Sequence, residues 1–499
     1  MYQDSSELVE FGPYLGGLLS RRSISASELS RLMAYKSRNT IFRILDGTCG
    51  NAARQAFFDK LIEEDPLGLS AEEREALARA LEISRVGAQA YLSNREMAVL
   101  VLGGRAQEEA PIRVYGRQYG MSCVPLTQVL QEYTQGRQLR LAVTGCCTGA
   151  VMNALREALL DREHDCAVDV VHYVYTGQEE IIANISAIQP MLCAPCYQAY
   201  SIRPGVYSPQ REQIYRNNCI CVHAVQKDGS EFEEALVQLE SDRMVRFERR
   251  ERGGFMMAGS MLGDARLKDY PIKSGFMLSS VTQGLSEYIE QYRQIEYGRA
   301  IYSVKLDLPF NFIHPDVLVK AAQHGFVESG QVKPEELDAL IAQLYEIQLQ
   351  RWENTFFKRK PTYMVLYRPA MEAFARTGRQ SDHYFALRPY TREERVSILK
   401  HIRTQARENP NLFVYFLKED VQPPLMEITL YDGEGVLLSH AFTQYDHRHS
   451  EAIIAQSEFC RQYKTYFTGD LLERRVVSRE EALSILNGLV EIAESADEQ

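Results

Sequence analysis

Several features that define whole classes of proteins are missing from this sequence. No apolar run approaches the about 18 residues that a membrane-spanning helix requires. The opening segment MYQDSSELVEFG is acidic and lacks the apolar core of a signal peptide. Neither internal repeats nor low-complexity linkers stand out, and ten cysteines in 499 residues are too sparse for a disulfide scaffold. These absences favour a cytoplasmic protein without a membrane partner.

Common catalytic motifs are missing as well. There is no Gly-x-Ser-x-Gly elbow and no His-Glu-x-x-His helix. None of the ten histidines is followed two residues later by lysine, as in the His-x-Lys motif of phospholipase D enzymes. We therefore expect no catalytic residues and no cofactor, and a chain that is not an enzyme, although the large C-terminal part leaves room for hidden chemistry.

A cationic window near the amino end contrasts with the acidic whole. The chain carries a formal net charge of −11. Between positions 20 and 45 the only anion is Glu28, against six cations, a local charge of +5: Arg21, Arg22, Arg31, Lys36, Arg38 and Arg43. A basic patch on an acidic protein indicates a polyanionic partner more specifically than an overall basic balance does.

The same window predicts two short helices joined by a turn. Ser25 and Glu28 form the Ser-x-x-Glu pattern of a helix start, and apolar residues follow at helical spacing: Leu29, Leu32 and Met33. Ser37 can cap the second helix, which carries Ile41, Ile44 and Leu45 on one side and cations and amides on the other. Gly47 stands where that helix should end.

These residues resemble the helix-turn-helix of the Cro/lambda-repressor family of regulators. The resemblance covers roughly residues 8 to 60 and is carried by Leu29-Ser30, by Ala34-Tyr35-Lys36-Ser37-Arg38 and by Ile41-Phe42-Arg43-Ile44. Ala26 and Ala34 depart from the usual Gln and Gly, and the turn is one residue longer than the commonest pattern. The resemblance implies a bacterial or phage protein that binds double-stranded DNA as a homodimer.

The chemistry of the second helix suggests a role for each predicted DNA-binding residue. Arg38 can bind guanine in a bidentate manner, Asn39 can pair with adenine, and Thr40 can contact a thymine methyl group, with Ser37 beside them. Lys36 and Arg43 are expected to bind phosphates, and Arg21 and Arg22 to reach the DNA backbone. A solvated side chain is the alternative for each, and is the preferred interpretation for Arg31.

The remainder of the chain predicts a large α/β (α+β) body. Expected strands at 139–144 and 167–175 alternate with helices at 149–161 and 179–187, which favours a parallel layer. Further strands are expected at 219–225, 235–240, 244–249, 301–306, 363–366, 412–417, 426–431 and 436–439, and helices at 334–357, 391–407, 448–464 and 479–494.

This pattern gives a multidomain fold, with an N-terminal all-α helix-turn-helix domain before the α/β body. The expected parts are 1–66, the helix-turn-helix domain; 67–110, a helical extension; 111–332, a first sensor half; 333–360, a connector helix; and 361–499, a second half. Two similar halves are weakly phospholipase-D-like in architecture.

Three other constellations have competing interpretations. Cys193, Cys196, Cys219 and Cys221 could bind zinc or act as a redox switch, but buried thiols are favoured over both. Thr144–Gly149 joins a strand to a helix and could bind an anion, yet it matches no phosphate-loop pattern, and a tight turn is favoured. The segment 446–449 could hold a metal, but a solvated loop is favoured.

Together these observations predict a sequence-specific DNA-binding transcriptional regulator whose C-terminal body senses a small-molecule or protein effector or drives oligomerisation. The alternative is an enzyme of unknown chemistry with an ancillary helical domain. A protein-interaction scaffold is a third, weaker interpretation.

Overall fold

The computed structural model describes residues 8–496 apart from positions 36, 103–112, 117–119, 135–136, 146–148, 161–167, 176–180, 193–196, 203–204, 206–207, 210–218, 227–231, 242–243, 251–272, 278–294, 330–332, 358, 381–386, 422–423, 425 and 441–449. The contacts between its residues divide the chain into two units, Met1–Glu96 and Met97–Gln499. We call them unit 1 and unit 2 and describe each by itself.

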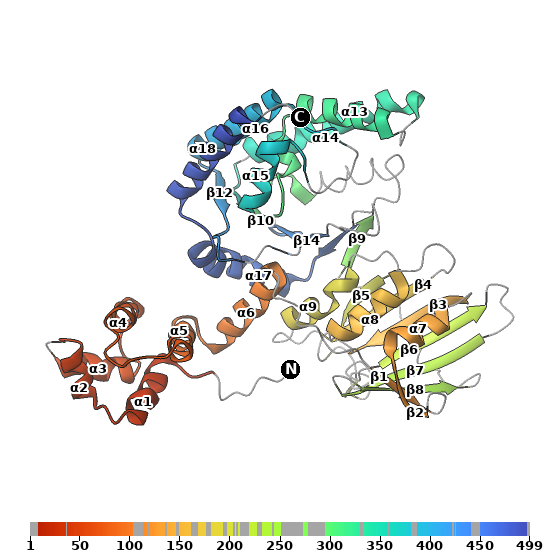
Figure 1. Cartoon of the computed structure of the whole chain (residues 1–499). Helices are drawn as coiled ribbons and strands as arrows, with labels where there is room; N and C mark the ends of the chain where they lie inside the picture. The colour runs from red at the N-terminus through yellow and green to blue at the C-terminus, as the bar shows by residue number, and fades with distance from the viewer. Residues whose placement is uncertain are drawn as a thin grey trace. The chain divides into compact units, whose positions relative to one another are not determined.

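Unit 1 is helical throughout its described part (Figure 1). Its helices are α1 (Phe11–Arg21), α2 (Ala26–Leu32), α3 (Arg38–Leu45), α4 (Asn51–Glu64), α5 (Ala71–Val86) and the first part of α6 (Ala88–Leu102). Serine side chains cap α2, α3 and α5 by accepting hydrogen bonds from backbone N–H groups of the first turn. One apolar core unites α1 to α5 and includes Phe11, Leu29, Ile41, Phe57 and Leu77.

Unit 2 contains two sheets, and the first is mixed. Within the described residues its strand order is β2-β1-β8-β7-β6-β3-β4-β5. The strands are β1 (Arg113–Gly116), β2 (Gly120–Pro125), β3 (Arg137–Thr144), β4 (Val168–Tyr175), β5 (Tyr197–Ile202), β6 (Cys219–Gln226), β7 (Phe232–Ser241) and β8 (Met244–Arg250). β3, β4 and β5 are parallel, and the helices α7 (Leu126–Thr134), α8 (Gly149–Leu160) and α9 (Ile181–Leu192) share their apolar core.

The second sheet has the described order β12-β11-β10-β13-β14-β15-β9. Its strands are β9 (Lys273–Met277), β10 (Ile301–Lys305), β11 (Thr362–Leu366), β12 (Leu412–Phe416), β13 (Glu427–Tyr431), β14 (Gly435–His440) and β15 (Ser450–Ile454). β10, β11 and β12 are parallel and the others pair antiparallel, beginning with β10 against β13.

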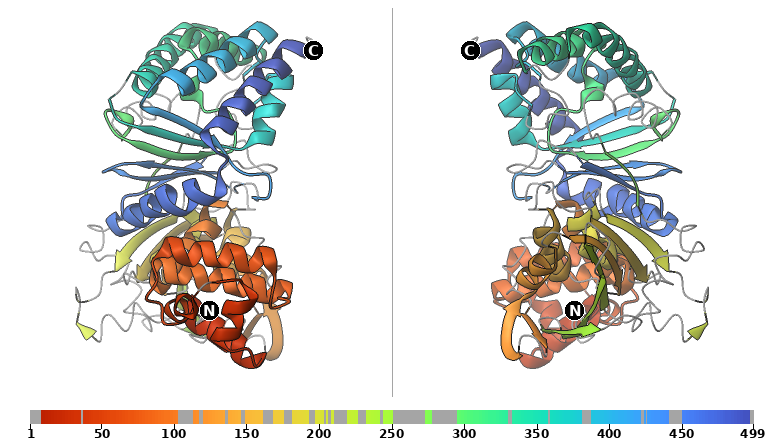
Figure 2. Two further views of the ribbon diagram at one scale, coloured as in Figure 1. Left: turned by 90° about the vertical axis from the view of Figure 1, so that its left-hand side faces the viewer. Right: turned by 90° about the vertical axis from the view of Figure 1, so that its right-hand side faces the viewer.

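Helices cover both faces of this second sheet because its buried strands alternate apolar side chains between the two sides. Figure 2 shows one group of helices on one face and α17 (Ser457–Tyr466) on the other. The first group, whose buried residues share one core with Met364 and Val414, comprises α13 (Pro315–Ser329), α14 (Pro334–Phe356), α15 (Arg368–Thr377), α16 (Arg392–Glu408) and α18 (Arg479–Ser495). The short helix η3 (Phe310–Phe312) precedes α13, and a π-helix, η4 (Phe467–Arg475), follows α17.

An aromatic cluster ties α14 to α16 inside that core. Trp352, the chain's single tryptophan, stacks on His401 with ring centroids 5.4 Å apart. Phe356 meets the same imidazole edge-on at 4.7 Å. Burial lowers the pKa of His401, so this histidine stays neutral near pH 7 and packs as an aromatic ring.

The predicted fold class is confirmed in its coarse form, a multidomain chain with a helical part and an α/β part. The hairpin predicted across Asp432 and Gly433 is present as β13 and β14. Two details were wrong. The segment predicted as a helix at 448–464 begins with β15, a strand held between β14 and β9, and turns helical only at Ser457. The helix predicted as a connector is α14, which links two adjacent parallel strands of one sheet, β10 and β11.

Across the residues that the structure describes, none of the helices has the length and apolarity needed to cross a membrane.

Candidate functional site

The turn between α2 and α3 is built from backbone hydrogen bonds that end α2 sharply. The N–H of Ala34 donates to the carbonyl of Arg31 at 3.1 Å, and the N–H of Tyr35 donates to that of Ser30 at 2.9 Å. This pair of bonds is the Schellman arrangement, which places one residue in the left-handed region. Ala34 occupies that position with a φ of 51°. It stands where the resembled family usually has glycine, so the turn keeps its shape at a cost in backbone strain.

Ser37 starts α3 immediately after this turn. Its hydroxyl accepts a hydrogen bond from the N–H of Asn39 at 3.2 Å. The apolar side of α3 packs against the rest of unit 1, because Ile41 and Ile44 are buried in its core. The opposite side is therefore fixed as the outer face of α3.

The outer face of α3 carries polar, cationic and aromatic side chains. Arg38, Asn39, Phe42 and Arg43 are exposed, whereas Thr40 is half-buried. At about 100° per residue, Phe42 lies between Arg38 and Asn39 around the helix axis, and Thr40 lies on the far side. We call Arg38, Asn39, Phe42 and Arg43 the α3 face.

The two arginines of the α3 face are available for an external anion. Neither Arg38 nor Arg43 forms an ion pair within the described part of the chain. Arg31 lies 3.7 Å from Glu28 and its side chain is 79% exposed, which agrees with its interpretation as a solvated residue.

Arg22, a predicted contact with the DNA backbone, already has a partner. Its Nη2 donates to Oε2 of Glu73 at 2.6 Å, which joins the end of α1 to the start of α5. This hydrogen bond, assisted by one from the backbone N–H of Ser70, lowers the pKa of Glu73 to about 2, and it raises the pKa of Arg22. Arg21, the other predicted contact, is exposed.

A buried arginine supports α3 from beneath its carboxyl end. Arg54 on α4 is 6% exposed. Its guanidinium donates to the carbonyls of Gly47 and Cys49 at 3.2 Å and to that of Ser84 at 3.1 Å. These bonds hold the loop after α3 against α4 and α5, and they therefore fix the position of the carboxyl end of α3.

The structure thus brings together most of the residues predicted from sequence, but Thr40 is half-buried and Arg22 is paired with Glu73. Ser37, Arg38, Asn39 and Arg43 gather at α3, while Thr40 points to the half-buried side. Phe42 takes the outward position that was assigned to Thr40, and sequence reasoning missed it. Its spacing of four residues from Arg38 was the available signal. Lys36 lies outside the described residues.

The cysteine hypothesis falls largely outside the described part. Cys193 and Cys196 lie outside the described residues, and Cys219 and Cys221 lie on β6 opposite Thr144 and Ala142 of β3. Positions 146–148 of the proposed anion turn and the segment 446–449 also lie outside. Among the described residues, no group of three or more His, Cys, Asp or Glu side chains could hold a metal ion.

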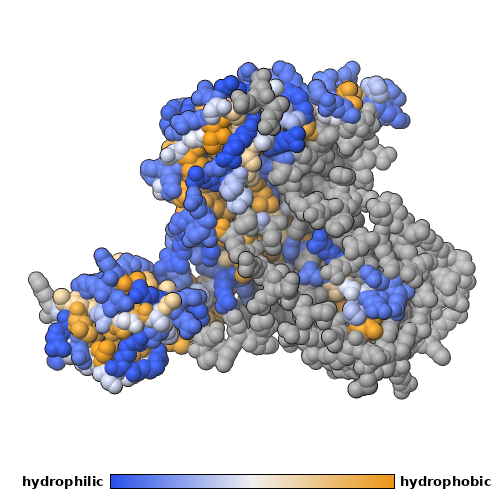
Figure 3. Space-filling model, viewed as in Figure 1, coloured by the Kyte–Doolittle hydropathy of each residue, from blue (hydrophilic) through white to orange (hydrophobic). Residues whose placement is uncertain are grey.

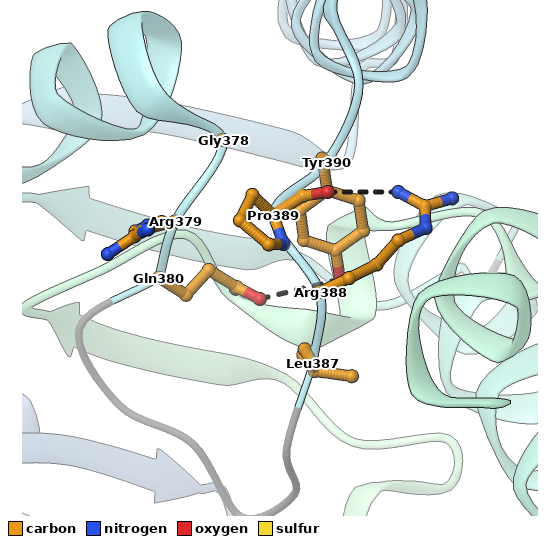
Figure 4. A pocket seen from close by; sticks show the side chains of 7 residues that line it. All are labelled: Gly378, Arg379, Gln380, Leu387, Arg388, Pro389 and Tyr390. Atoms are coloured by element: carbon orange, nitrogen blue, oxygen red, sulfur yellow. Dashed lines mark hydrogen bonds between the residues drawn. The ribbon is translucent and has the colours of Figure 1, made fainter. Parts of the chain in front are cut away.

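A cavity of about 280 Å³ lies in unit 2 beside the loop that joins α15 to α16 (Figure 4). Gly378 closes this loop with a φ of 69°, and its carbonyl accepts a hydrogen bond from the N–H of Tyr390 at 2.9 Å. A Cβ at Gly378 would lie 2.2 Å from the carbonyl oxygen of Tyr390, so only glycine fits there.

The polar side chains that line this cavity bond to the protein itself. Gln380 donates to the carbonyl of Leu308 at 2.7 Å, and the Tyr390 hydroxyl donates to Gln380. Arg388 forms two 2.7 Å bonds with Glu394, and Arg379 points away from Tyr390 in Figure 4. The described lining therefore holds the loop in place and offers little for a ligand.

A second polar cluster lies where the parallel strands of the second sheet end. Lys305, the last residue of β10, bonds Glu427 at 2.5 Å, and both side chains are 16% exposed. The backbone N–H of Leu306 donates to the same carboxylate at 3.2 Å. The buried carboxylate of Asp307 follows two residues after Lys305. The carboxyl ends of parallel strands are the usual place for ligands in open α/β sheets.

Comparison with known proteins gives little. No protein-family model and no curated protein matches the chain. Among solved structures, the phosphatidylserine synthase of Haemophilus influenzae Rd KW20 is 12% identical, with a TM-score of 0.23, over 81% of this chain and 98% of that one. A TM-score of this size carries no argument about the fold, reaction or substrate of this chain.

The sequence predicted a transcriptional regulator that is not an enzyme, but the solved structure named above is an enzyme and not a regulator. The predictions of a regulator and of a chain without enzymatic activity are therefore withdrawn.

Proposed function

We propose that unit 1 is an ancillary module that binds double-stranded DNA, with the α3 face in the major groove. One observation carries this proposal: the α3 face presents Arg38 and Arg43, neither with an ion pair among the residues that the structure describes, around an amide and an aromatic ring. The proposal concerns binding by this module and assigns it no role in transcription.

The shape of α3 is compatible with the proposal. An α-helix with its side chains is about 10–12 Å across, and the major groove is about 12 Å wide. Arg38 and Asn39 stand at the amino end, which reaches base edges in helix-turn-helix proteins. The resemblance to the Cro/lambda-repressor family, which stays a prediction, points to the same placement.

The test uses the full-length chain and duplexes selected by it from random DNA. Binding should weaken steeply with salt, because neutralised phosphates release counterions. Arg38→Ala should cost about 1–3 kcal/mol and relax the preference at one base pair, whereas Arg43→Ala should weaken binding to all sequences alike. If both variants bind as the wild type does, the α3 face is not the DNA contact.

The homodimer predicted for this motif class is part of the proposal. Two copies of α3 would read half-sites about one helical turn apart, so the selected sequences should show a two-fold repeat at that spacing. A single unrepeated site, together with one protein chain per duplex by sedimentation, would contradict it.

For unit 2 we propose an enzymatic site at the carboxyl end of β10. The specific observation is the Lys305–Glu427 pair, held by the N–H of Leu306 and followed by buried Asp307. A lysine beside a carboxylate can hold and transfer a proton, which is the basic requirement of general acid–base chemistry. The phospholipase-D-like relation between the two sheets stays a prediction.

This second proposal can be tested without knowing the substrate. The full-length protein is incubated with a cell metabolite extract, and compounds consumed or formed are identified by mass spectrometry. Lys305→Met should abolish any conversion that the wild type performs. Lys400→Met is the matched control, because the Lys400–Glu494 pair has a similar length, 2.7 Å, but both side chains are 47% exposed. Conversion that survives Lys305→Met excludes this site.

A further inference from the structure

Phe42 is an unusual residue for the outer face of a helix in a well-packed unit. It is 45% exposed, although the core of unit 1 is directly behind α3. Most large apolar side chains in this unit are buried, whereas almost half of this ring stays in contact with water and adds no burial energy. Hydrophobic side chains reach the surface among hydrophilic ones in several places (Figure 3), but Phe42 is the one on the α3 face.

The position of Phe42 on the helix is central. It lies about 40° from Arg38 and about 60° from Asn39 around the axis, at about 100° per residue. The ring therefore faces the same side of the helix as these two side chains, about one helical turn further along the axis than Arg38. In the major groove the apolar feature of a base edge is the C5 methyl group of thymine, which aromatic and aliphatic side chains contact.

We infer that Phe42 is a specificity-determining residue that packs on a thymine methyl group next to the bases read by Arg38 and Asn39. This inference rests on the proposed DNA binding by unit 1 and names the base that its apolar side chain selects. It replaces the thymine contact first assigned to Thr40, which lies on the half-buried side of the helix.

Replacing thymine by uracil tests the inference directly, since deoxyuridine pairs normally and lacks only the methyl group. The full-length protein is titrated against its selected duplex, and each thymine is replaced in turn. One thymine in each half-site should respond, with about a fourfold loss of affinity, the equivalent of about 0.8 kcal/mol for one buried methyl group.

The variant Phe42→Ala should bind thymine and uracil duplexes equally well, at about the wild-type affinity for the uracil duplex. Leu32→Ala is the matched control, because Leu32 is also 45% exposed but lies on α2. It should keep the full fourfold penalty. Melting temperatures show that both variants remain folded, as expected for exposed positions.

The outcomes separate the two claims. A uracil penalty that persists in Phe42→Ala, or the lack of a responding thymine in the wild type, overturns the inference and leaves DNA binding intact. The inference is also overturned if Phe42→Ala changes only the oligomeric state. Failure to bind any duplex overturns the proposed function itself.

Discussion

The arginines of the α3 face and those around the second sheet behave in opposite ways. Arg38 and Arg43 extend from unit 1 into solvent without an ion pair in the described chain. Arg351 bonds Glu296 at 3.0 Å, with the two side chains 16% and 5% exposed, and Arg388 forms a bidentate pair with Glu394. A guanidinium that is satisfied inside the protein stabilises the fold, whereas one without a partner is available to a polyanion.

The largest effect should come from breaking the buried pair of the second sheet. Arg351→Met leaves the carboxylate of Glu296 buried without its cation, although Tyr431 still donates to it at 3.1 Å. Removing one partner of a buried pair costs about 3–5 kcal/mol. Urea unfolding monitored by circular dichroism measures this loss.

The matched control for that variant is Arg407→Met. Arg407 pairs with Glu408, but the side chains are 63% and 60% exposed. Exposed pairs contribute about 0–1 kcal/mol, so this variant should unfold nearly as the wild type does. Equal losses in the two variants would show that burial does not distinguish these arginines.

A crossed pair of variants sharpens the comparison. Arg388→Ala should lower the free energy of unfolding by about 1.5–3 kcal/mol, since charged hydrogen bonds are lost, and leave DNA affinity unchanged. Arg38→Ala should do the reverse, with unfolding unchanged and DNA affinity reduced. Fluorescence anisotropy with a labelled duplex and urea titration give the two readouts, and a variant that changes both would remove the distinction.

A smaller effect is expected in the turn that positions α3. Ala34→Gly relieves the left-handed strain at φ 51° but adds freedom to the unfolded chain, for a net gain of at most about 1 kcal/mol. Ala53→Gly, at an exposed position within α4, should instead lose about 1 kcal/mol. Thermal unfolding compares the stability of the two variants. A loss of stability in Ala34→Gly as large as that in Ala53→Gly would show that the backbone at Ala34 is not strained.

The smallest effect on stability is expected from the Arg22–Glu73 pair of unit 1. The pKa of Glu73 falls from 4.5 to about 2 in the fold, so its contribution is fully present above about pH 4.5 and is lost as the pH falls towards 2. Glu73→Gln should remove this part of the pH dependence, whereas Glu63→Gln, on the exposed side of α4, should retain it. Urea midpoints at pH 7, 4 and 2.5 decide between these outcomes.

The ends of the short helices could be predicted from local signals, whereas the pairing of distant strands could not. Ser25 and Ser37 cap α2 and α3 as their spacing indicates, because a cap depends on residues two or three positions away. β15 was assigned to a helix because its place between β14 and β9 depends on pairing across the sheet, which no periodicity within the segment reveals.

The candidate site was predictable to a similar degree. The polar residues at the start of α3 were found from their chemistry. Phe42 was not found, because an aromatic side chain is ordinarily expected to be buried. Its exposure can be recognised only when the buried side of the helix is known. The pairing of Arg22 with Glu73 spans 51 residues and depends on how α1 packs on α5.

The location of Trp352 gives the molecule a built-in spectroscopic marker. Because the sequence has a single tryptophan and it stacks on His401 within unit 2, all indole emission originates there. Unit 1 can melt without altering that emission, while its helices still contribute to circular dichroism. Recording the two signals in one denaturation experiment therefore assigns each transition to a unit of the intact chain.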